Sequence, residues 1–371
     1  MGSKKVLLLS LKIFSATGGI EKVCKIAGKV FYEYSEDNNA NLFIYAMHDD
    51  KAVFDSKYFP DKVYKAFNAN KLLFGIKAIR TGVSSDIIIL SHANLLLFGY
   101  IIKLIKPSVK LVLFAHGIEV WKPFSRLQSI WLNRCNTIIC VSNFTKQKMV
   151  DIHVIDSNKC TVVNNCLDPF LQKPNNRSKN PVLLERYGLT MQNKIMLTLS
   201  RLSAHDRHKG YDKVIVALKE LKNNFPNLIY LIAGKYEEAE KQWIDKLIKE
   251  YKLENRIILT GYVADDELAA HIELADLYVM PSIKEGFGII FIESLYYGIP
   301  VIGGNKDGTK DALANGSFGQ LIDPENQIEI TDAIRNTILH KEKYIPNHNS
   351  VLEYFGYQKY KSNLLQALSL N

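Results

Sequence analysis

Two carboxylates flank a pair of glycines in the last third of the chain. Glu285 immediately precedes Gly286-Phe287-Gly288, and Glu293 follows Glu285 by eight residues. The glycines give the G-x-G-x-x form of a phosphate-binding loop, without the third glycine of a dinucleotide fingerprint. The apolar run "DLYVMPS" precedes them and an apolar helical pattern follows. The pattern therefore predicts a strand, a loop and a helix N-terminus that suits a phosphate.

A ligand with a central pyrophosphate and a polyol at each end would explain carboxylates beside a phosphate site. The helix N-terminus would bind the phosphates, Glu285 would accept hydrogen bonds from a sugar, and Glu293 would accept them from a ribose. Such a ligand is a nucleotide-sugar. The alternative is that Glu293 forms a structural ion pair in a buried helix and that Glu285 is an ordinary loop residue.

Two cations follow another apolar run. Arg201 comes directly after "IMLTLS", and Lys209 lies eight residues further on in "HDRHKG". Together they could bind a diphosphate and neutralise the charge that develops as it leaves. A solvated basic loop is the alternative, and it is the better interpretation for His205, Arg207 and His208.

Short apolar runs alternate with helical patterns along the chain, which is typical of parallel strands covered by helices. We expect ten strands: "KKVLLLSL", "DIIILSH", "KLVLFAH", "TIICVS", "IMLTLSR", "LIYLIAG", "RIILTGY", "ADLYVMPS", "PVIGG" and "GQLIDP". The polar segment 171–181 interrupts the alternation and predicts an interdomain linker. Two doubly wound domains in tandem would leave a cleft at the carboxyl ends of their strands.

Composition is that of an ordinary globular protein. The 371 residues are 47% hydrophobic and 23% charged. The most apolar segment, 87–102, is too short and too interrupted by polar residues to predict a membrane span. The five scattered cysteines lack C-x-x-C spacing, and no secretory signal opens the sequence. We therefore expect reduced thiols and a cytoplasmic location.

Positive charge is concentrated in the first half. Residues 1–178 contain 24 Lys and Arg against 13 Asp and Glu, a net charge of +11, whereas the whole chain carries +9. The segments 71–80 and 100–106 are apolar with basic flanks, so one hypothesis is docking on the anionic inner face of the cytoplasmic membrane. The alternative is that both segments pack on the sheet with their lysines in water.

These motifs together resemble glycosyltransferase family 4, whose members are retaining enzymes with the two-domain GT-B fold. Glu285 and Glu293 resemble its E-x7-E signature. The other resemblances are Gly18-Gly19, His116-Gly117, Val141-Ser142, Arg201 with Lys209-Gly210, and Gly298-x-Pro300-Val301 followed by Gly303-Gly304. The sequence departs from the family pattern at Asn165-Cys166-Leu167-Asp168 and at Asp307-Gly308-Thr309-Lys310-Asp311, where Asp311 replaces a glutamate.

The resemblance implies an α/β GT-B architecture with an acceptor-side domain over 1–172, a linker over 173–184, a nucleotide-sugar domain over 185–349, and a C-terminal helix over 350–371 that packs toward the first domain. The implied catalytic residues are His116, which lies against the donor sugar, Glu285, Arg201 and Lys209. The expected donor-binding residues are Gly19, Gly286, Phe287, Gly288, Ile289, Ile290 and Glu293. Gly19 could meet phosphates through its N–H or simply form a tight turn.

The sequence therefore predicts a retaining hexosyltransferase that uses a GDP- or UDP-sugar and a glycan or lipid-linked acceptor, as in polysaccharide or lipopolysaccharide assembly. No D-x-D motif and no His, Cys or Asp cluster with metal-ligand spacing occurs, so we expect no metal, no other cofactor and no nucleic-acid partner. A GT-B nucleotide-sugar epimerase and a nucleotide-sugar-binding module without turnover are the alternatives.

Overall fold

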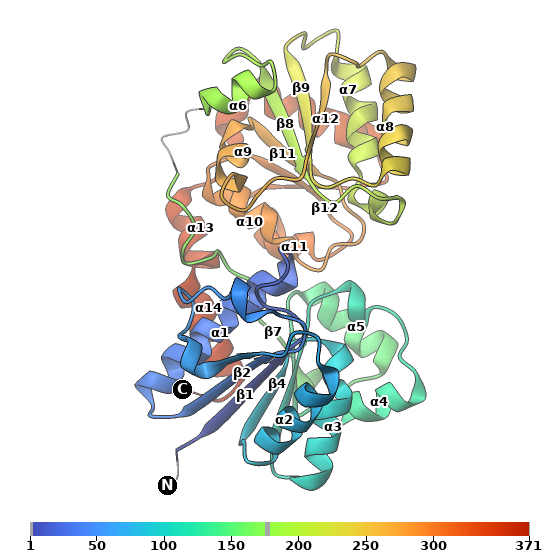
Figure 1. The fold of residues 1–371 in the computed structure, drawn as a ribbon. Helices are drawn as coiled ribbons and strands as arrows, with labels where there is room; N and C mark the ends of the chain where they lie inside the picture. Colours follow the sequence, from blue (N-terminus) through green and yellow to red (C-terminus); the bar gives the residue numbers. More distant parts are fainter. Residues whose placement is uncertain (1–2, 175–178, 371) are drawn as a thin grey trace. The chain divides into compact units, whose positions relative to one another are not determined.

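The computed structural model describes residues 3–174 and 179–370. The chain divides into two compact units (Figure 1). Unit 1 contains the described residues through Pro169 together with those from Tyr357 onward, and unit 2 runs from Phe170 to Gly356. Unit 1 is therefore formed by two separate segments of the chain, and unit 2 is formed by the segment between them.

Unit 1 is built on a seven-stranded parallel sheet in the order β3-β2-β1-β4-β5-β6-β7. Its strands are β1 (Lys5–Ser10), β2 (Asn41–Ala46), β3 (Tyr64–Ala66), β4 (Ile87–Leu90), β5 (Lys110–Ala115), β6 (Thr137–Cys140) and β7 (Cys160–Val162). The strands β2 and β3 extend the sheet on one side of β1, and β4 to β7 extend it on the other. The direction of winding therefore reverses between β1 and β4.

Helices and short 3-10 turns connect these strands. The helices are α1 (Gly19–Asp37), α2 (Lys71–Val83), α3 (Leu96–Ile105), α4 (Arg126–Asn133), α5 (Asn143–His153) and α14 (Tyr357–Ala367). The turns are η1 (Lys51–Val53), η2 (Asp61–Val63), η3 (Ala93–Leu95), η4 (Ile118–Val120) and η5 (Ser157–Lys159). Apolar side chains of α2 to α5 share one core cluster with alternate residues of the strands.

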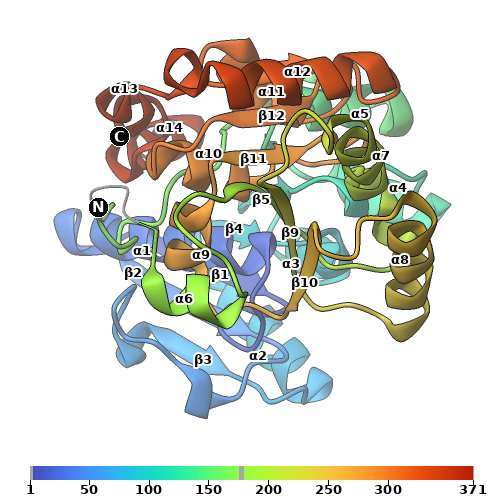
Figure 2. The same cartoon turned by 90° about the horizontal axis from the view of Figure 1, so that it is seen from above.

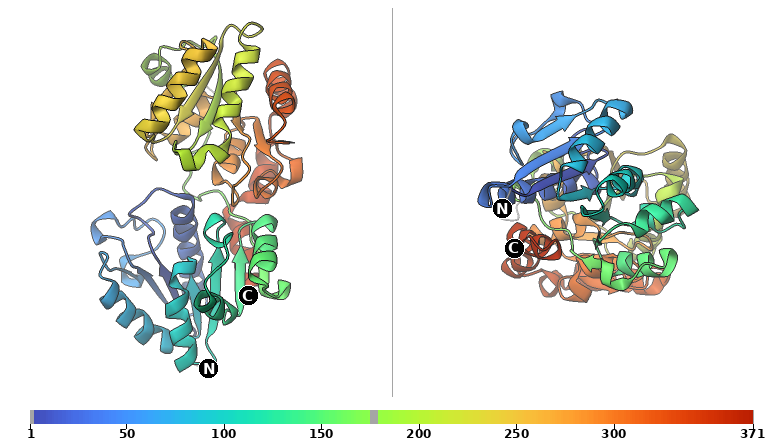
Figure 3. Two further views of the ribbon diagram at one scale, coloured as in Figure 1. Left: turned by 90° about the vertical axis from the view of Figure 1, so that its right-hand side faces the viewer. Right: turned by 90° about the horizontal axis from the view of Figure 1, so that it is seen from below.

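The last helix of the chain, α14, is attached to α1. Tyr357 Oη and Lys361 Nζ each donate to the Glu33 carboxylate at 2.9 Å. Lys110 Nζ donates to the Leu368 carbonyl at 2.7 Å. Figure 3 shows the end of the chain, marked C, within unit 1.

Unit 2 contains a six-stranded parallel sheet in the order β10-β9-β8-β11-β12-β13. Its strands are β8 (Lys194–Leu199), β9 (Leu228–Ala233), β10 (Ile257–Gly261), β11 (Leu277–Met280), β12 (Val301–Gly304) and β13 (Gln320–Ile322). The winding reverses between β8 and β11, which are adjacent. Both units are therefore doubly wound, as the alternating pattern predicts.

The helices of unit 2 are α6 (Pro181–Arg186), α7 (Tyr211–Leu221), α8 (Glu238–Tyr251), α9 (Leu268–Leu274), α10 (Ile289–Tyr296), α11 (Thr309–Ala312), α12 (Gln327–Leu339) and α13 (His348–Phe355). Three short turns are η6 (Ala204–Lys209), η7 (Ala314–Gly316) and η8 (Lys341–Tyr344). The helices α7 and α12 pack against each other (Figure 2), and their buried faces join the core of this sheet.

All ten predicted strands are present, and the prediction of an α/β fold with two doubly wound units is confirmed. The strands β2, β3 and β7 were not predicted. Both β3 and β7 are only three residues long and lie at the two edges of the sheet. Edge strands of this length leave too short an apolar run to detect.

The last residues of the predicted linker over 173–184 are helical in the structure. Residues 175–178 lie outside the described residues, but α6 already begins at Pro181. Asn180 Oδ1 accepts from Val182 N at 2.9 Å, and proline occupies the first helical position. This is a strong helix start, so 181–184 is helix. The first segment of unit 1 also ends at Pro169 rather than at residue 172.

The single C-terminal helix predicted over 350–371 is wrong. The structure has two helices, α13 from His348 and α14 from Tyr357, separated by Gly356. Gly356 is extended (φ −71°, ψ 157°), and a Cβ there would lie 2.3 Å from the Leu352 carbonyl oxygen. Helix α13 belongs to unit 2 and α14 to unit 1, so the break marks the return of the chain. Residue 371 lies outside the described residues.

Within the described ranges, no helix is long and apolar enough to cross a membrane. The five cysteines are buried free thiols.

Candidate active site

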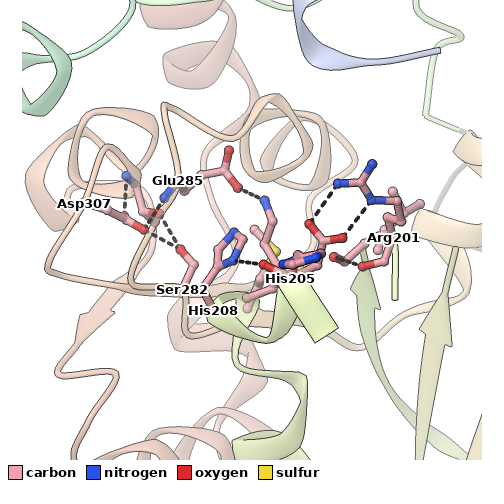
Figure 4. Close-up of polar contacts among 12 residues, drawn as sticks. Arg201, His205, His208, Ser282, Glu285 and Asp307 are labelled. Atoms are coloured by element: carbon pink, nitrogen blue, oxygen red, sulfur yellow. Dashed lines mark hydrogen bonds and ion pairs between the residues drawn. The ribbon is translucent and has the colours of Figure 1, made fainter. Parts of the chain in front are cut away.

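The candidate site lies where the winding of the unit 2 sheet reverses. In open α/β sheets, ligands bind beyond the carboxyl ends of the two strands at this reversal. Here the strands are β8 and β11. Arg201 follows β8, and Ser282 and Glu285 follow β11. Figure 4 shows these three side chains with His208 and Asp307 around the same group of loops.

Arg201 is held by a carboxylate from its own loop. Its Nε and Nη2 donate to Asp206 at 2.7 and 3.2 Å, and Ser203 Oγ donates to the same carboxylate at 2.5 Å (Figure 4). Burial by itself raises the pKa of Asp206, but the hydrogen bonds from Arg201 and Ser203 outweigh it and hold that pKa below its usual range. The Arg201 side chain remains 70% exposed. It is a fixed cation with donors still facing solvent.

Lys209 and Glu285 form an ion pair. Their side chains are only 19% and 16% exposed. The loops that carry them are joined again where Ile283 N donates to the His208 carbonyl at 3.0 Å. Two predicted catalytic residues, 76 positions apart in the sequence, are therefore in direct contact.

Gly210 allows the two loops to approach. Its φ is +79°, and a Cβ there would lie 2.5 Å from the Pro281 carbonyl oxygen. Both facts require glycine. The Lys-Gly pair thus has a physical reason: the glycine brings the β8–α7 loop close to the end of β11, and the lysine reaches Glu285.

Asp307 fixes the backbone of Glu285. Its Oδ2 accepts from Glu285 N and Ser282 Oγ, both at 2.7 Å, and its Oδ1 accepts from Thr309 N at 2.9 Å. Asp307 is 1% exposed. Burial raises its pKa to about 6, against the lowering effect of the hydrogen bonds from Thr309 and Ser282.

Gly308 completes this junction. Its N–H donates to the Glu285 carbonyl at 2.9 Å, and a Cβ would lie 2.0 Å from the Gly286 carbonyl oxygen. From the sequence, Asp307-Gly308 stands out only as a departure from a family pattern. An Asp-Gly pair just beyond the carboxyl end of β12, the neighbour of β11, was the signal that could have identified it.

His208 was interpreted from the sequence as an ordinary loop residue. Its Nδ1 lies 2.7 Å from the His205 carbonyl oxygen, and its Nε2 is buried without a hydrogen-bond partner among the described residues. Burial and the neighbouring Lys209 cation lower its pKa. The ring is therefore an unsatisfied neutral group beside the ion pair, a feature that usually has an explanation in ligand or water binding.

Helix α10 opens toward this site without a side-chain cap. Gly288 precedes it with a φ of +84°, and a Cβ there would lie 2.5 Å from the Phe291 ring. Phe291 N donates to the Gly288 carbonyl at 3.1 Å, which leaves the N–H groups of Ile289 and Ile290 as the first-turn donors of the kind that bind anions at helix N-termini. The predicted burial of the helix is confirmed, and Glu293 inside it is 1% exposed.

Phe287 occupies a different position from the rest of the predicted donor site. Its side chain is 1% exposed, and its ring lies 6.1 Å from that of Phe355 on α13. The Phe287 side chain is therefore part of the core, and only the backbone of Phe287 could contact a ligand.

Gly19 and His116 belong to unit 1. Gly19 begins α1 after the first strand, and no side chain caps that helix. His116 follows β5 and is 9% exposed. Its Nε2 lies 2.8 Å from the Ser91 carbonyl oxygen, while its Nδ1 is buried without a partner in the described part of the chain. Because a carbonyl oxygen only accepts hydrogen bonds, Nε2 is the donor. In an uncharged ring Nδ1 is then an acceptor, and a hydroxyl group could donate to it.

Two family models match the chain, one for most of each unit. The model described as "Glycosyltransferase Family 4" matches residues 43–169, and that described as "Glycosyl transferases group 1" matches residues 182–357. Together they cover most of the described chain.

Curated relatives match over part of their length. The GDP-mannose-dependent alpha-(1-6)-phosphatidylinositol monomannoside mannosyltransferase of Mycobacterium tuberculosis is 29% identical over 185 residues, which is 48% of this chain and 46% of that protein. The 2-deoxystreptamine N-acetyl-D-glucosaminyltransferase of Niallia circulans is 27% identical over 180 residues, or 48% of this chain and 44% of that protein. The match thus spans about half the length of these relatives.

Solved structures agree with the fold over the whole chain. The Anabaena protein Alr3699/HepE, in complex with UDP and glucose, has a TM-score of 0.79 at 21% identity and covers 99% of both chains. The lipopolysaccharide outer core galactosyltransferase WaaB, in its apo form, has a TM-score of 0.69 at 16% identity, covering 98% of this chain and 99% of that one. The fold is therefore GT-B, and with both family models matched the chain belongs to glycosyltransferase family 4.

Proposed function

We propose that the protein is a retaining, metal-independent glycosyltransferase that moves a hexosyl unit from a nucleoside diphosphate sugar to a hydroxyl of a glycan or lipid-linked acceptor. One observation carries the proposal. At the reversal point of the unit 2 sheet, two cations are each fixed by a carboxylate beside a helix N-terminus that has no cap.

This arrangement suits a diphosphate. Arg201 uses two of its five donors on Asp206, and Lys209 uses one of its three on Glu285. The remaining donors, with the N–H groups at the start of α10, can hold phosphate oxygens without a large rearrangement. Fixed cations also stabilise charge that develops on a departing phosphate, because they need no reorganisation during the reaction.

In the proposed reaction the bond between the anomeric carbon and the diphosphate oxygen breaks. The acceptor oxygen bonds to the same face of that carbon, and its proton passes to an oxygen of the leaving diphosphate. The products are the glycoside and the nucleoside diphosphate. Arg201 and Lys209 would stabilise the diphosphate as its negative charge increases.

Glu285 would hold the sugar. The ion pair with Lys209 and the backbone contact with Asp307 leave the Glu285 carboxylate oriented, with lone pairs for sugar hydroxyls. In unit 1, the Nδ1 atom of His116, which has no partner among the described residues, would accept a hydrogen bond from a hydroxyl group. Glu293, buried in α10, would accept from the ribose.

The relatives suggest which donors to try. One relative is named as GDP-mannose-dependent, and a structural neighbour was solved with UDP and glucose. The name of the first relative includes a phosphatidylinositol acceptor, and that of WaaB refers to lipopolysaccharide. These names support a nucleotide-sugar donor and a lipid-linked or glycan acceptor for this chain.

Proton NMR of the purified protein with GDP-mannose, UDP-glucose and their N-acetyl relatives tests the proposal. Without an acceptor, we expect slow hydrolysis of the donor. With an acceptor, we expect a glycoside whose anomeric configuration matches that of the donor. Both reactions should proceed in excess EDTA. An inverted linkage, or loss of activity in EDTA that a metal ion restores, would contradict the mechanism. An epimerised donor would indicate an epimerase, and donor binding without any turnover would indicate a binding module.

A further inference from the structure

Unit 1 exposes large apolar side chains on three consecutive helices. Two come from each of α2, α3 and α4, and each is between 47% and 76% exposed. The six residues, which we call the apolar strip, are Leu72, Ile76, Leu104, Ile105, Leu127 and Ile130. Single exposed leucines are ordinary, but a group on adjacent elements is not.

The three helices form one continuous surface. The helix α3 packs against α2 on one side and α4 on the other (Figure 1). Leu72 and Ile76 are four residues apart and Leu127 and Ile130 three apart, so each pair lies on one helix face. The opposite faces supply Phe74, Leu96 and Leu132 to the core. The apolar strip is therefore additional to what the fold needs.

The charge of this surface has a single sign. Between Lys71 and Arg134 the sequence has nine Lys and Arg against two Asp and Glu, and the three helices themselves contain no acidic residue. The two acidic side chains are already engaged. Asp86 accepts from Lys5 N at 2.9 Å, and Glu119 accepts from the N–H groups of His116 and Gly117.

Exposed cations border the apolar strip. They are Lys71, Arg80, Lys122, Arg126 and Arg134, and among the described residues none of them forms an ion pair. An apolar face with a cationic border is the pattern of an interfacial surface, which inserts side chains between lipids while its lysines and arginines meet anionic headgroups.

We propose that the α2–α3–α4 face of unit 1 docks on an anionic lipid bilayer. A sheet of anionic headgroups matches three helices that carry cations and no carboxylate, and the lipid chains beneath it match the apolar strip. The inference deepens the proposed function and rests on it in part, because a lipid-linked acceptor would then be reached from the membrane surface.

Sedimentation of the full-length chain with vesicles tests the proposal. We expect binding to phosphatidylglycerol–phosphatidylcholine vesicles and no binding to pure phosphatidylcholine. Binding should be lost as the salt concentration rises from about 0.05 M to about 0.5 M, because the Debye length shortens over this range. Lys71→Gln, Arg80→Gln and Arg126→Gln together should lower the binding constant by roughly 100-fold.

A second variant tests the apolar contribution. Leu72→Gln, Ile76→Gln and Leu127→Gln together should also weaken binding, by roughly 10-fold or more. Ile328→Gln with Leu339→Gln is the matched control, because these residues of α12 in unit 2 are 74% and 55% exposed. The control should bind vesicles like the unmodified chain.

Donor hydrolysis, measured in the same proteins without vesicles, separates this inference from the proposed function. Hydrolysis should be unchanged in all three variants, since none touches the candidate site. Equal binding to neutral and anionic vesicles, no vesicle binding at all, or binding that the strip variants leave intact would overturn the docking proposal. So would a dimer in analytical ultracentrifugation that the strip variants convert to monomers, because the strip would then be covered by a second copy.

Discussion

Two cations of the candidate site are each bound to a carboxylate, and this pairing determines how their loss should appear. Arg201 has Asp206 as its partner, and Lys209 has Glu285. Removing either cation takes a positive charge from the proposed diphosphate site. It also leaves its carboxylate partner unneutralised at the same place, so the net charge of the pair changes from zero to −1 beside the proposed diphosphate.

We therefore expect Arg201→Ala and Lys209→Ala each to lower kcat by about 10²-fold, as for other lost donors that stabilise developing charge. Steady-state kinetics with the preferred donor measures this. Lys246→Ala is the matched control, because Lys246 is an exposed lysine on α8, and its kcat should be unchanged. Folded Arg201 or Lys209 variants with normal kcat would remove the cation pair from the mechanism.

Asp307 gives a pH-dependent prediction. Its pKa is raised to about 6 in the folded protein from an ordinary value of 3.8. Between these pH values the folded protein keeps a proton that the unfolded chain has released, so the free energy of unfolding falls as pH rises through this window. The amide introduced by Asp307→Asn cannot titrate. Between about pH 4 and about pH 7, the free energy of unfolding of the unmodified protein should therefore fall by about 2 kcal/mol relative to that of Asp307→Asn.

Urea unfolding can be assigned to unit 2 in this experiment. The chain has three tryptophans, and Trp121→Phe with Trp131→Phe leaves Trp243 of α8 as the reporter. The constant loss of one hydrogen-bond acceptor in Asp307→Asn cancels when the two pH values are compared. A stability difference that is the same at both pH values would show that Asp307 ionises normally.

At the scale of elements, the site depends on close contacts between loops. These contacts cannot be predicted from the pattern of residues in the sequence. The strands and the buried α10 were predictable because apolar runs and helical spacing are local signals. The contact of Asp307 with Glu285 could not be predicted. The two residues are far apart in the sequence, and they meet only because β11 and β12 are neighbours in the sheet. The break at Gly356 was missed because a lone glycine does not always end a helix.

Gly210 is the loop contact whose removal is easiest to interpret. Gly210→Ala places a Cβ 2.5 Å from the Pro281 carbonyl oxygen and a side chain at a φ of +79°, so the loop carrying Lys209 must move. We expect donor affinity to fall by roughly 10-fold or more, equivalent to about 1.4 kcal/mol, in a titration of thermal stability against donor concentration.

Gly188→Ala is the matched control for this variant. Gly188 also has a positive φ, of +62°, but a Cβ there meets nothing within 4 Å. It should lose about 1–2 kcal/mol of stability from backbone strain alone and retain its donor affinity. If both variants bind donor equally well, the approach of the loops at Gly210 has no role in holding the donor.

On the scale of the whole molecule, the last helix belongs energetically to the first half of the chain. Leu364 of α14 is fully buried, and α14 is part of unit 1. Leu364→Ala should cost unit 1 about 2–5 kcal/mol and unit 2 nothing. Unfolding followed by Trp121 and Trp131, in a Trp243→Phe background, should shift to lower urea, while unfolding followed by Trp243 alone should not.

Gln366→Ala on the exposed side of α14 is the control, and it should leave both transitions in place. Equal shifts of both transitions with Leu364→Ala would mean that the two units unfold as one. The sequence could indicate that a helix closes the chain, but not that its residues divide between the units, because that division depends on which core receives each apolar side chain.

The return of the chain to unit 1 at Tyr357 has a consequence for synthesis on the ribosome. Unit 2 is one uninterrupted segment, so it can fold as soon as Gly356 has emerged. Unit 1, although its sheet is translated first, must wait for α14 while the whole of unit 2 is made, which takes roughly 10–40 s at about 5–20 residues per second. During that interval the nascent first sheet lacks the helix that covers part of α1, and it is the part of the nascent chain that chaperones would be expected to protect.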